Sequence, residues 1–318
     1  MRAFLALAVC GLILAAGCEK RRKKVIAVIP KGTSHPFWLS VEAGARAAGA
    51  ELGVEVLWNG PATELDYSRQ IQIVDAMIAR RVDGIAVAAA ERTALVQPID
   101  RAVAAGIPVT IFDSGLDSEN YMTFVATDNY EAGRMAGRKL AELVGGQGKL
   151  AMVLHSTGSF STMERERGFE DAIAGEFPKI RIVARQYGMS DRARSRAVAE
   201  NFLAVHPDLD GIFCSTEPSS TGASLALKAR GLAGKVRFVA FDSADGMIDD
   251  LRQGVIHAMV VQDPFRIGYE AVRTIAGKLN GQTPPKRIDL HARLITRQDL
   301  DQPEVRKLLF PDLQKANR

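Results

Sequence analysis

The alternation of short apolar runs with helical segments constrains the fold of this chain more than any other sequence feature. Residues 25–30 form an apolar run, and the segment that follows, 37–52, places Leu39, Ala43 and Ala47 on one side of a helix. The same order recurs to the end of the chain. Because a helix between two strands returns the chain to the same edge of a sheet, this order predicts parallel strands with right-handed crossovers.

The expected elements divide into two series. Strands are predicted at 25–30, 54–57, 84–89, 109–112, 124–129, 150–154, 180–185, 211–214, 238–241, 256–261 and 288–295. Helices are predicted at 37–52, 67–80, 94–105, 130–144, 192–206, 221–230, 246–253 and 265–279, with another beginning near 164. No long low-complexity linker separates the series. The sequence therefore predicts an α/β protein of two lobes that short segments join, as in a hinged pair of domains.

One phrase occurs in both halves. The apolar run 107–112 ends in Phe-Asp-Ser at 112–114, and 239–243 repeats this ending with Asp242. In open α/β sheets, ligands bind beyond the carboxyl ends of the strands. Asp113 and Asp242 are therefore candidate ligand-binding residues that face one cleft. The alternative is that each Asp caps a helix or closes a turn.

The first 17 residues are typical of a secretory signal peptide, because Arg2 precedes an apolar stretch, 3–16, that is short for a membrane span. The stretch ends in LAAGC at 14–18, which is similar to a bacterial lipobox. We therefore expect Cys18 to carry a lipid anchor, and residues 18–24 to form a basic tether. An ordinary signal peptide with an incidental cysteine is the alternative.

Charge and cysteine content exclude several function classes. Of the 41 Lys and Arg residues six lie before Val25, and of the 37 Asp and Glu residues one does, so the remainder is close to neutral. A basic run beside a lipid anchor favours anionic headgroups, and the secretory signal ahead of that run argues against nucleic-acid binding. Of the three cysteines only Cys214 lies beyond residue 18, within an apolar run, which predicts a buried thiol and neither a disulfide nor a metal cluster.

No catalytic or nucleotide-binding motif is present. The sequence contains neither His-Glu-x-x-His nor Gly-x-Ser-x-Gly, and the glycine-rich stretch 145–148 lies between a helix and a strand, the wrong order for a phosphate loop. His35 and His155 each follow a strand and could face a cleft. No acid–base partner is indicated by spacing, so we expect no enzyme activity and no cofactor or metal.

Aromatic and charged residues add to the candidate site. Phe37 and Trp38 lie in the loop that follows the first strand, where one is expected to enter the core while the other covers a ligand. Sugar rings stack on aromatic faces, and their hydroxyls bind to carboxylates and guanidinium groups. Arg165 begins a helix in the second half and is expected to point into the cleft.

Eight short phrases occur in the order of a known family. They are HPFW at 35–38, VDGI at 82–85, AGIPV at 105–109, FDS at 112–114, TDN at 127–129, R-x-x-G-F at 165–169, FD at 241–242 and QDP at 262–264. With them, residues 25–294 resemble the ribose-binding-like periplasmic binding proteins, whose type I fold is shared with LacI-type regulators.

The resemblance implies two Rossmann-like domains, three crossover segments near Asp128, Gln262 and Ile288, and a sugar clamped between the domains. The residues that it implies for ligand binding are His35, Phe37, Trp38, Asp113, Arg165, Thr216, Asp242 and Gln262. The chain departs from the family pattern at Ser114, where an Arg is common, at Thr216, where Asn is frequent, at Ser190, where an aromatic is usual, and at the turn 89–91. Because of these departures, the sequence does not decide whether the ligand is a pentose, a hexose or a polyol.

We therefore expect a lipid-anchored, extracytoplasmic solute-binding protein that delivers a monosaccharide or polyol to an ABC transporter permease and acts as a monomer. The expected lobes are 25–127 with 263–287, and 128–262 with 288–318. A ligand-sensing receptor of the same fold, signalling to a membrane kinase or chemoreceptor, is the alternative. A transcription regulator and a sugar-modifying enzyme are further rivals, which DNA binding or sugar turnover would reveal.

Overall fold

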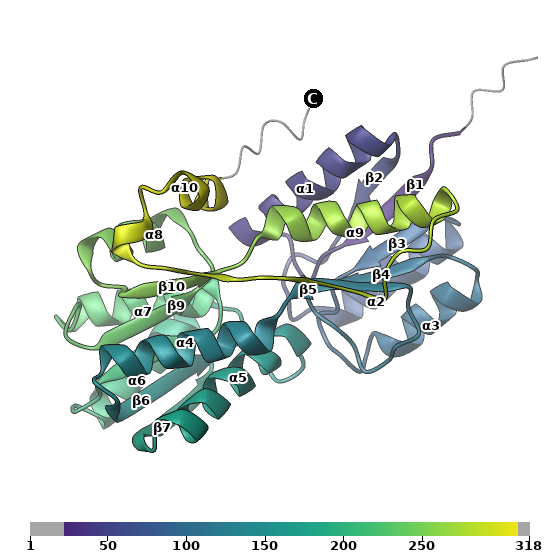
Figure 1. Ribbon diagram of the computed structural model, residues 1–318. Helices are drawn as coiled ribbons and strands as arrows, with labels where there is room; N and C mark the ends of the chain where they lie inside the picture. Colours follow the sequence, from purple (N-terminus) through teal and green to yellow (C-terminus); the bar gives the residue numbers. More distant parts are fainter. Residues whose placement is uncertain (1–21, 311–318) are drawn as a thin grey trace, which may run out of the picture.

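The computed structural model describes residues 22–310, which form two lobes, each built on a six-stranded sheet (Figure 1). The first sheet has the order β11-β5-β4-β3-β1-β2, with all neighbouring strands parallel. Its strands are β1 (Val25–Ile29), β2 (Glu55–Trp58), β3 (Gly84–Val87), β4 (Val109–Phe112), β5 (Thr123–Thr127) and β11 (Arg287–Leu290). We call this sheet with its helices the first lobe.

The second lobe repeats this arrangement with the order β12-β10-β9-β8-β6-β7. Its strands are β6 (Gln147–Leu154), β7 (Lys179–Tyr187), β8 (Gly211–Cys214), β9 (Arg237–Phe241), β10 (Ala258–Val261) and β12 (Arg293–Ile295). Only β12 runs antiparallel to its neighbour, β10. The prediction of a two-lobed, parallel α/β fold is thus confirmed.

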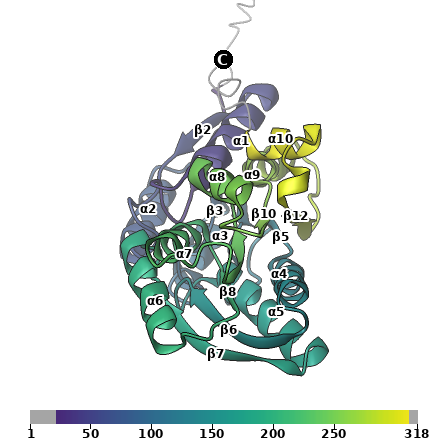
Figure 2. The same cartoon turned by 90° about the vertical axis from the view of Figure 1, so that its left-hand side faces the viewer.

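Helices cover both faces of each sheet. The first lobe has α1 (Pro36–Leu52), α2 (Tyr67–Ala79), α3 (Val96–Ala104) and α9 (Pro264–Leu279). The second lobe has α4 (Asn129–Leu143), α5 (Phe160–Glu176), α6 (Arg192–Val205), α7 (Glu217–Ala229) and α8 (Asp245–Gln253), with the 3-10 turn η1 (Arg297–Asp299) and α10 (Pro303–Leu309) packed on the same lobe. Figure 2 shows α4 beside α5 on one side of the second sheet, with α6 and α7 on the other.

Each sheet is therefore buried on both sides. In the first lobe, α2 and α3 pack on one face around Ile85, and α1 and α9 pack on the other around Val28. Cys214 belongs to the core of the second lobe, where burial raises the pKa of its thiol, as expected of a small buried residue. Burial on both faces explains why the strands are almost continuously apolar.

Glycines allow one helix pair in each lobe to approach closely. A Cβ atom on Gly44 of α1 would lie 1.8 Å from the backbone oxygen of Phe265 in α9, and one on Gly268 of α9 would lie 2.0 Å from that of Val41. In the second lobe, a Cβ atom on Gly133 of α4 would lie 1.9 Å from the backbone oxygen of Arg165 in α5. Any larger residue would force the paired helices apart.

Three crossovers connect the lobes (Figure 1). The chain crosses at Asp128 between β5 and α4, at 262–263 between β10 and α9, and at 291–292 between β11 and β12. The third crossover was predicted near Ile288, and the structure places it after Leu290, because Ile288 pairs with Val125 in the first sheet. Alternating apolar residues at 288, 290, 292 and 294 resemble one uninterrupted strand, so the sequence pattern hid the break.

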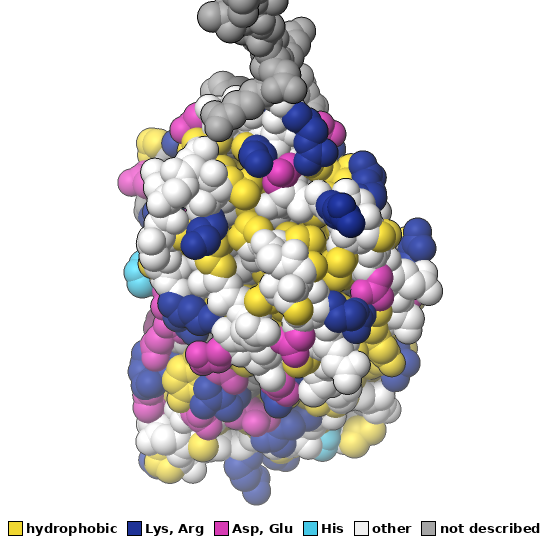
Figure 3. Space-filling view, turned by 90° about the vertical axis from the view of Figure 1, so that its right-hand side faces the viewer, with side chains coloured by type: hydrophobic (Ala, Val, Ile, Leu, Met, Phe, Trp, Pro, Cys, Tyr) yellow, Lys and Arg dark blue, Asp and Glu magenta, His cyan; other side chains and the backbone are white. Residues whose placement is uncertain are grey.

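The described surface carries mixed charge. On the face in Figure 3, Lys and Arg side chains are interspersed with Asp and Glu, in keeping with the near-neutral balance beyond the tether. Among residues 22–310, no helix has both the length and the apolar character that a membrane span requires. Cys18 and the predicted signal peptide lie outside the described residues.

Candidate ligand-binding site

A small cavity lies between the lobes, beyond the carboxyl ends of the parallel strands. It has a volume of about 30 Å³, room for about two water molecules. Its lining includes all eight residues predicted for ligand binding: His35, Phe37, Trp38, Asp113, Arg165, Thr216, Asp242 and Gln262. Residues Lys31, Glu64, His155, Ser161, Thr162, Glu217 and Pro218 complete the lining. The structure therefore brings the predicted residues together.

Asp113 and Asp242 occupy equivalent turns in the two lobes. Their backbones are left-handed, with φ of 56° and 64°, and both side chains are buried. Each backbone N–H donates to the strand beside its own, Asp113 to Val125 and Asp242 to Val260. Asp tolerates this backbone region better than most residues, and such strain concentrates at functional sites. The repeated Phe-Asp-Ser phrase thus encodes one turn that aims a carboxylate at the cavity.

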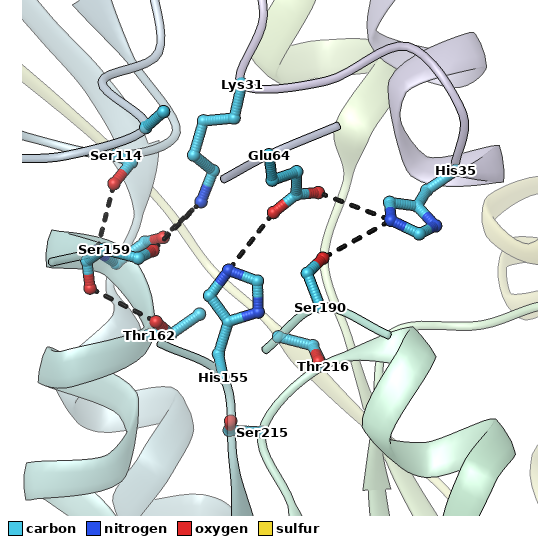
Figure 4. Close-up of polar contacts among 12 residues, drawn as sticks. Lys31, His35, Glu64, Ser114, His155, Ser159, Thr162, Ser190, Ser215 and Thr216 are labelled. Atoms are coloured by element: carbon cyan, nitrogen blue, oxygen red, sulfur yellow. Dashed lines mark hydrogen bonds and ion pairs between the residues drawn. The ribbon is translucent and has the colours of Figure 1, made fainter. Parts of the chain in front are cut away.

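Lys31, which follows β1, joins the two lobes. Its Nζ atom lies 3.3 Å from Asp113 Oδ2 and donates to the hydroxyls of Ser159 and Ser161, each at 3.2 Å, in the second lobe. Only 4% of Lys31 is exposed, so its charge depends on these partners (Figure 4). Asp113 therefore pairs with Lys31, whereas the sequence had suggested Arg165 as the cation across the cleft.

Glu64 lies in the loop between β2 and α2 and is bound from both lobes. Trp38 Nε1 donates to Glu64 Oε1 at 2.8 Å, and His155 Nε2 lies 3.2 Å from Glu64 Oε2. Burial alone would raise the pKa of Glu64, but the hydrogen bond from His155 and the charge of Lys31 outweigh it and hold that pKa far below its usual value. Burial also lowers the pKa of His155. A neutral His155 that donates through Nε2 leaves Nδ1 to accept a hydrogen bond.

His35 lies between two carboxylates of opposite lobes, and Figure 4 shows it beside one of them, Glu64. Its Nδ1 atom is 3.7 Å from Glu217 Oε2, and its Nε2 atom is 4.0 Å from Glu64 Oε1 and 3.4 Å from the Ser190 hydroxyl. Glu217 is buried at the start of α7, where Arg192 Nη2 donates to its Oε1 atom at 2.8 Å. The polar contacts thus continue from the first lobe into α7.

Arg165 is held by acceptors of its own lobe. It donates from Nη1 to the Ser215 carbonyl and from Nη2 to Asn129 Oδ1, and its guanidinium lies 3.5 Å from the centroid of the Phe241 ring. These contacts fix the guanidinium beside the cavity and leave Nε without a hydrogen bond. Burial lowers the pKa of Arg165 against the opposing charges of Asp242 and Asp113.

The two adjacent aromatic side chains differ in burial. Trp38 is 1% exposed and packs in the first-lobe core, edge-on to Phe37 at 4.9 Å and to Phe112 at 6.4 Å between ring centroids. Phe37 is only half-buried and lies at the cavity. Trp38 therefore has mainly a structural role, with Glu64 as its hydrogen-bond partner. Phe37 is the better candidate for stacking on a ligand.

Several buried polar atoms of the cavity make no hydrogen bond to any residue in the described range 22–310. They are Asp113 Oδ2, His155 Nδ1, Arg165 Nε, Glu217 Oε2 and Gln262 Oε1. Gln262 also donates through Nε2 to Asp242 Oδ1 at 2.8 Å, which holds the two side chains together. Buried polar atoms without partners are costly, and in native proteins they mark places where another molecule supplies the bond. These atoms come from both lobes and converge on one space.

Sequence reasoning missed Lys31, Glu64 and Glu217. Lys31 follows a strand and Glu217 adjoins the predicted Thr216, so position relative to strand ends could have suggested both. Glu64 carries no such signal, because it lies within a loop whose path depends on packing. Within the part of the chain that is described, no three His, Cys, Asp or Glu side chains are arranged to hold a metal ion.

Comparisons with known proteins agree with this geometry. Residues 26–283 match the family described as periplasmic binding protein domain. A D-ribose/D-allose-binding protein of Pseudomonas aeruginosa is 30% identical, over 86% of this chain and 88% of the relative. The ribose import binding protein of Bacillus subtilis is 27% identical, over 83% of this chain and 84% of the relative. Both relatives are binding proteins of small sugars by name.

Solved structures share the whole two-lobed architecture. An ABC transporter solute-binding protein of Agrobacterium vitis with bound D-fucose has a TM-score of 0.87 and 34% identity, covering 90% of this chain and 100% of that one. A carbohydrate transporter solute-binding protein of Agrobacterium radiobacter with D-arabinose has a TM-score of 0.88 and 30% identity, covering 91% and 99%. The chain belongs to the periplasmic binding protein family.

Proposed function

We propose that this protein captures a small sugar or polyol between its lobes and delivers it to an ABC transporter permease. The observation that carries the proposal is that buried polar atoms of both lobes, which accept or donate no hydrogen bond within residues 22–310, converge on one cavity. Hydroxyl groups both donate and accept, so a polyhydroxylated ligand suits carboxylate, amide and imidazole acceptors beside a guanidinium donor. The sugars in the names of the relatives support the same class.

Binding and delivery depend on closure of the lobes. Asp113 lies in the first lobe and Arg165 in the second, so one ligand contacts both only when the cleft is closed. The ligand therefore favours the closed state by the contacts that this state adds. A permease that recognises the closed arrangement of the two lobes would then distinguish loaded from empty protein.

We further propose that the protein works outside the cytoplasm as a monomer on a lipid anchor at Cys18. Arg22 and Lys24 pair with Asp83, which precedes β3 at the end of the sheet opposite the cavity. The tether therefore enters the first lobe on the side remote from the cleft, which leaves the cleft accessible above a membrane. Replacement of Cys18 by Ser should release the protein from membranes, and persistence there after a high-salt wash would contradict the anchor.

A thermal-shift screen of monosaccharides and polyols tests the function, because a ligand that binds only the folded protein raises the melting temperature by mass action. Hits are then measured by calorimetry on the wild type and on Asp113→Asn and Asp242→Asn. We expect one stereochemical class to bind, and each substitution to weaken its binding because an amide removes a charged acceptor. The absence of any shift across the panel would overturn the proposal.

A further inference from the structure

The charges of the cleft do not balance. Four carboxylates line the cavity: Glu64, Asp113, Glu217 and Asp242. The cations are Lys31 and Arg165 in the cavity wall and Arg192, which reaches Glu217 from the rim and is 49% exposed at its side chain. Water screens an exposed guanidinium, so the buried part of the cleft has a clear excess of negative charge.

The pairings locate this excess. Lys31 forms an ion pair with Asp113. Arg192 donates a hydrogen bond to Oε1 of Glu217, whereas Oε2 of Glu217 accepts none within the described residues. Asp242 accepts only from the neutral amide of Gln262, and burial raises the pKa of its carboxyl although the charge of Arg165 opposes that shift. An uncompensated buried charge is costly, so the closed cleft favours a group that brings positive charge.

Neither His155 nor His35 gives Glu217 Oε2 a hydrogen bond within the described residues. Burial lowers the pKa of His155, which keeps that ring neutral. His35 lies 3.7 Å from Glu217 Oε2 and 4.0 Å from Glu64 Oε1, and both distances exceed those of a hydrogen bond. At these distances His35 does not satisfy Glu217 Oε2, which therefore stays available to a ligand.

The unpartnered atoms point the same way. Among the described cavity atoms without a hydrogen bond, Glu217 Oε2, His155 Nδ1 and Gln262 Oε1 are acceptors. Asp113 Oδ2 is a further acceptor that is already paired with Lys31, and Arg165 Nε is a donor. The cavity therefore requires a ligand that donates more hydrogen bonds than it accepts. An ammonium group has three donors and no acceptor, whereas a carboxylate or phosphate has only acceptors.

We propose that the ligand of this protein is an amino sugar, bound as its ammonium form, and that Glu217 is the residue that selects the amino group. This inference rests on the proposed function and narrows its ligand class. A neutral sugar would leave the excess negative charge in the closed cleft, and a uronic acid or sugar phosphate would add to it. The protein should therefore prefer the amino sugar to its neutral parent and reject the acid.

Matched ligand trios test the inference on the full protein at neutral pH. Each trio shares one ring stereochemistry: glucosamine, glucose and glucuronate; galactosamine, galactose and galacturonate; mannosamine, mannose and mannuronate. In at least one trio we expect the amino sugar to raise the melting temperature most and the acid to give no shift. Calorimetry should then give a Kd for the amino sugar about tenfold or more below that of the neutral parent.

Neutral parents that bind as tightly as, or more tightly than, the amino sugars in every trio would overturn the inference and leave the proposed function intact. No binding by any member of the panel, with pentoses and polyols included, would overturn both. The two failures are therefore distinguishable in one experiment.

Substitutions identify the residue that binds the amino group and selects for it. Glu217→Gln should abolish the preference, measured as the ratio of the Kd values for the neutral and amino sugars, because an amide keeps the shape and removes the charge. Glu142→Gln is the matched control, since the Glu142 side chain is 69% exposed on α4 outside the cavity, and it should leave the ratio unchanged. If Glu217→Gln fails to fold, Glu64→Gln tests the charge of the cleft instead. An unchanged ratio in a folded Glu217→Gln protein would overturn the assignment to Glu217.

Discussion

Lys31 connects more of the cleft than any residue that the sequence had suggested. It ties Asp113 of the first lobe to Ser159 and Ser161 of the second. Lys31→Met should weaken ligand binding by about 2–5 kcal/mol, because closure would then bury Asp113 without its cation. Calorimetry measures the loss, and Lys278→Met, at an exposed position of α9, is the control. Equal affinity of the Lys31→Met protein and the wild type would show that this ion pair does not support closure.

Glu166 gives the second lobe a pH-dependent stability. Burial raises the pKa of its carboxyl to about 7, although the backbone N–H of His155 and the Ser215 hydroxyl donate to it. The unfolded chain loses this proton near its ordinary value of 4.5, so the folded state holds the proton to higher pH. The free energy of unfolding should therefore fall between about pH 5 and 7, by up to about 3 kcal/mol, and then level off.

Denaturant unfolding of wild type and Glu166→Gln across this pH range tests the effect. Gln accepts the same two hydrogen bonds without a titrating proton, so the difference in stability between the two proteins should change only in this window. Glu200→Gln, on the surface of α6, should reproduce the wild-type curve. Parallel curves for wild type and Glu166→Gln would contradict the prediction.

At the residue scale, the sequence was informative where a side chain follows a strand. Asp113 and Asp242 could be predicted because the end of a buried strand fixes their position and the phrase is repeated. Glu64 could not, since nothing local determines which loop residue turns inward. The Lys31–Asp113 pair could not be predicted either. Both Lys31 and Arg165 occupy positions from which a cation could reach Asp113, and only the orientation of their side chains decides which one does.

The start of α5 contributes a contact between the two lobes in the closed state. Phe160 belongs to the second lobe, yet its ring packs on the first-lobe core, edge-on to Phe124 at 6.3 Å and against Gly115. It does not line the cavity. Phe160→Ala should therefore weaken ligand binding by about 1–2 kcal/mol without touching the ligand, because a half-buried aromatic contact of the closed state is lost. Calorimetry gives the affinity, and the melting temperature without ligand should stay close to that of the wild type.

Leu225→Ala is the control for loss of an apolar side chain, since Leu225 is 41% exposed on α7. If Phe160→Ala lowers the stability of the ligand-free protein as much as it weakens binding, then the ring belongs to the fold and not to closure.

The elements themselves were largely predictable, because strands buried on both faces have unbroken apolar runs and the helices between them have regular apolar spacing. The exception is the stretch 287–295, where β11 and β12 belong to different sheets although the residues alternate as one strand. Periodicity reports which side chains are buried, and it contains no information about the sheet that buries them. For the same reason the sequence did not show why α1, α4 and α9 contain glycines. A glycine is required there only because a second helix packs against it.

At the scale of the whole molecule, the cavity of about 30 Å³ is too small to admit a sugar while the lobes stay together. Contacts between the lobes surround it: the Arg92 backbone N–H donates to Gly158, the Ser161 backbone N–H donates to Ser114, and Glu64 binds His155. Ligand entry must break these contacts and rotate the lobes about the three crossovers. Opening of the lobes should therefore be required for every binding event.

A covalent lock between the lobes tests this requirement. Ser161 N lies 3.2 Å from Ser114 Oγ, so the two residues are neighbours across the cleft, and the variant Ser114→Cys/Ser161→Cys is designed to join them by a disulfide. Among residues 22–310 the one native cysteine, Cys214, is buried, so its thiol does not compete with the introduced pair. The oxidised protein should bind the ligand at least about a hundredfold more slowly, and reduction should restore the rate, because the lock removes the open state that admits the ligand.

Stopped-flow measurements give the rates, each single cysteine variant is the control, and mass spectrometry confirms the cross-link. An unchanged rate in fully cross-linked protein would mean that the ligand enters without separation of the lobes.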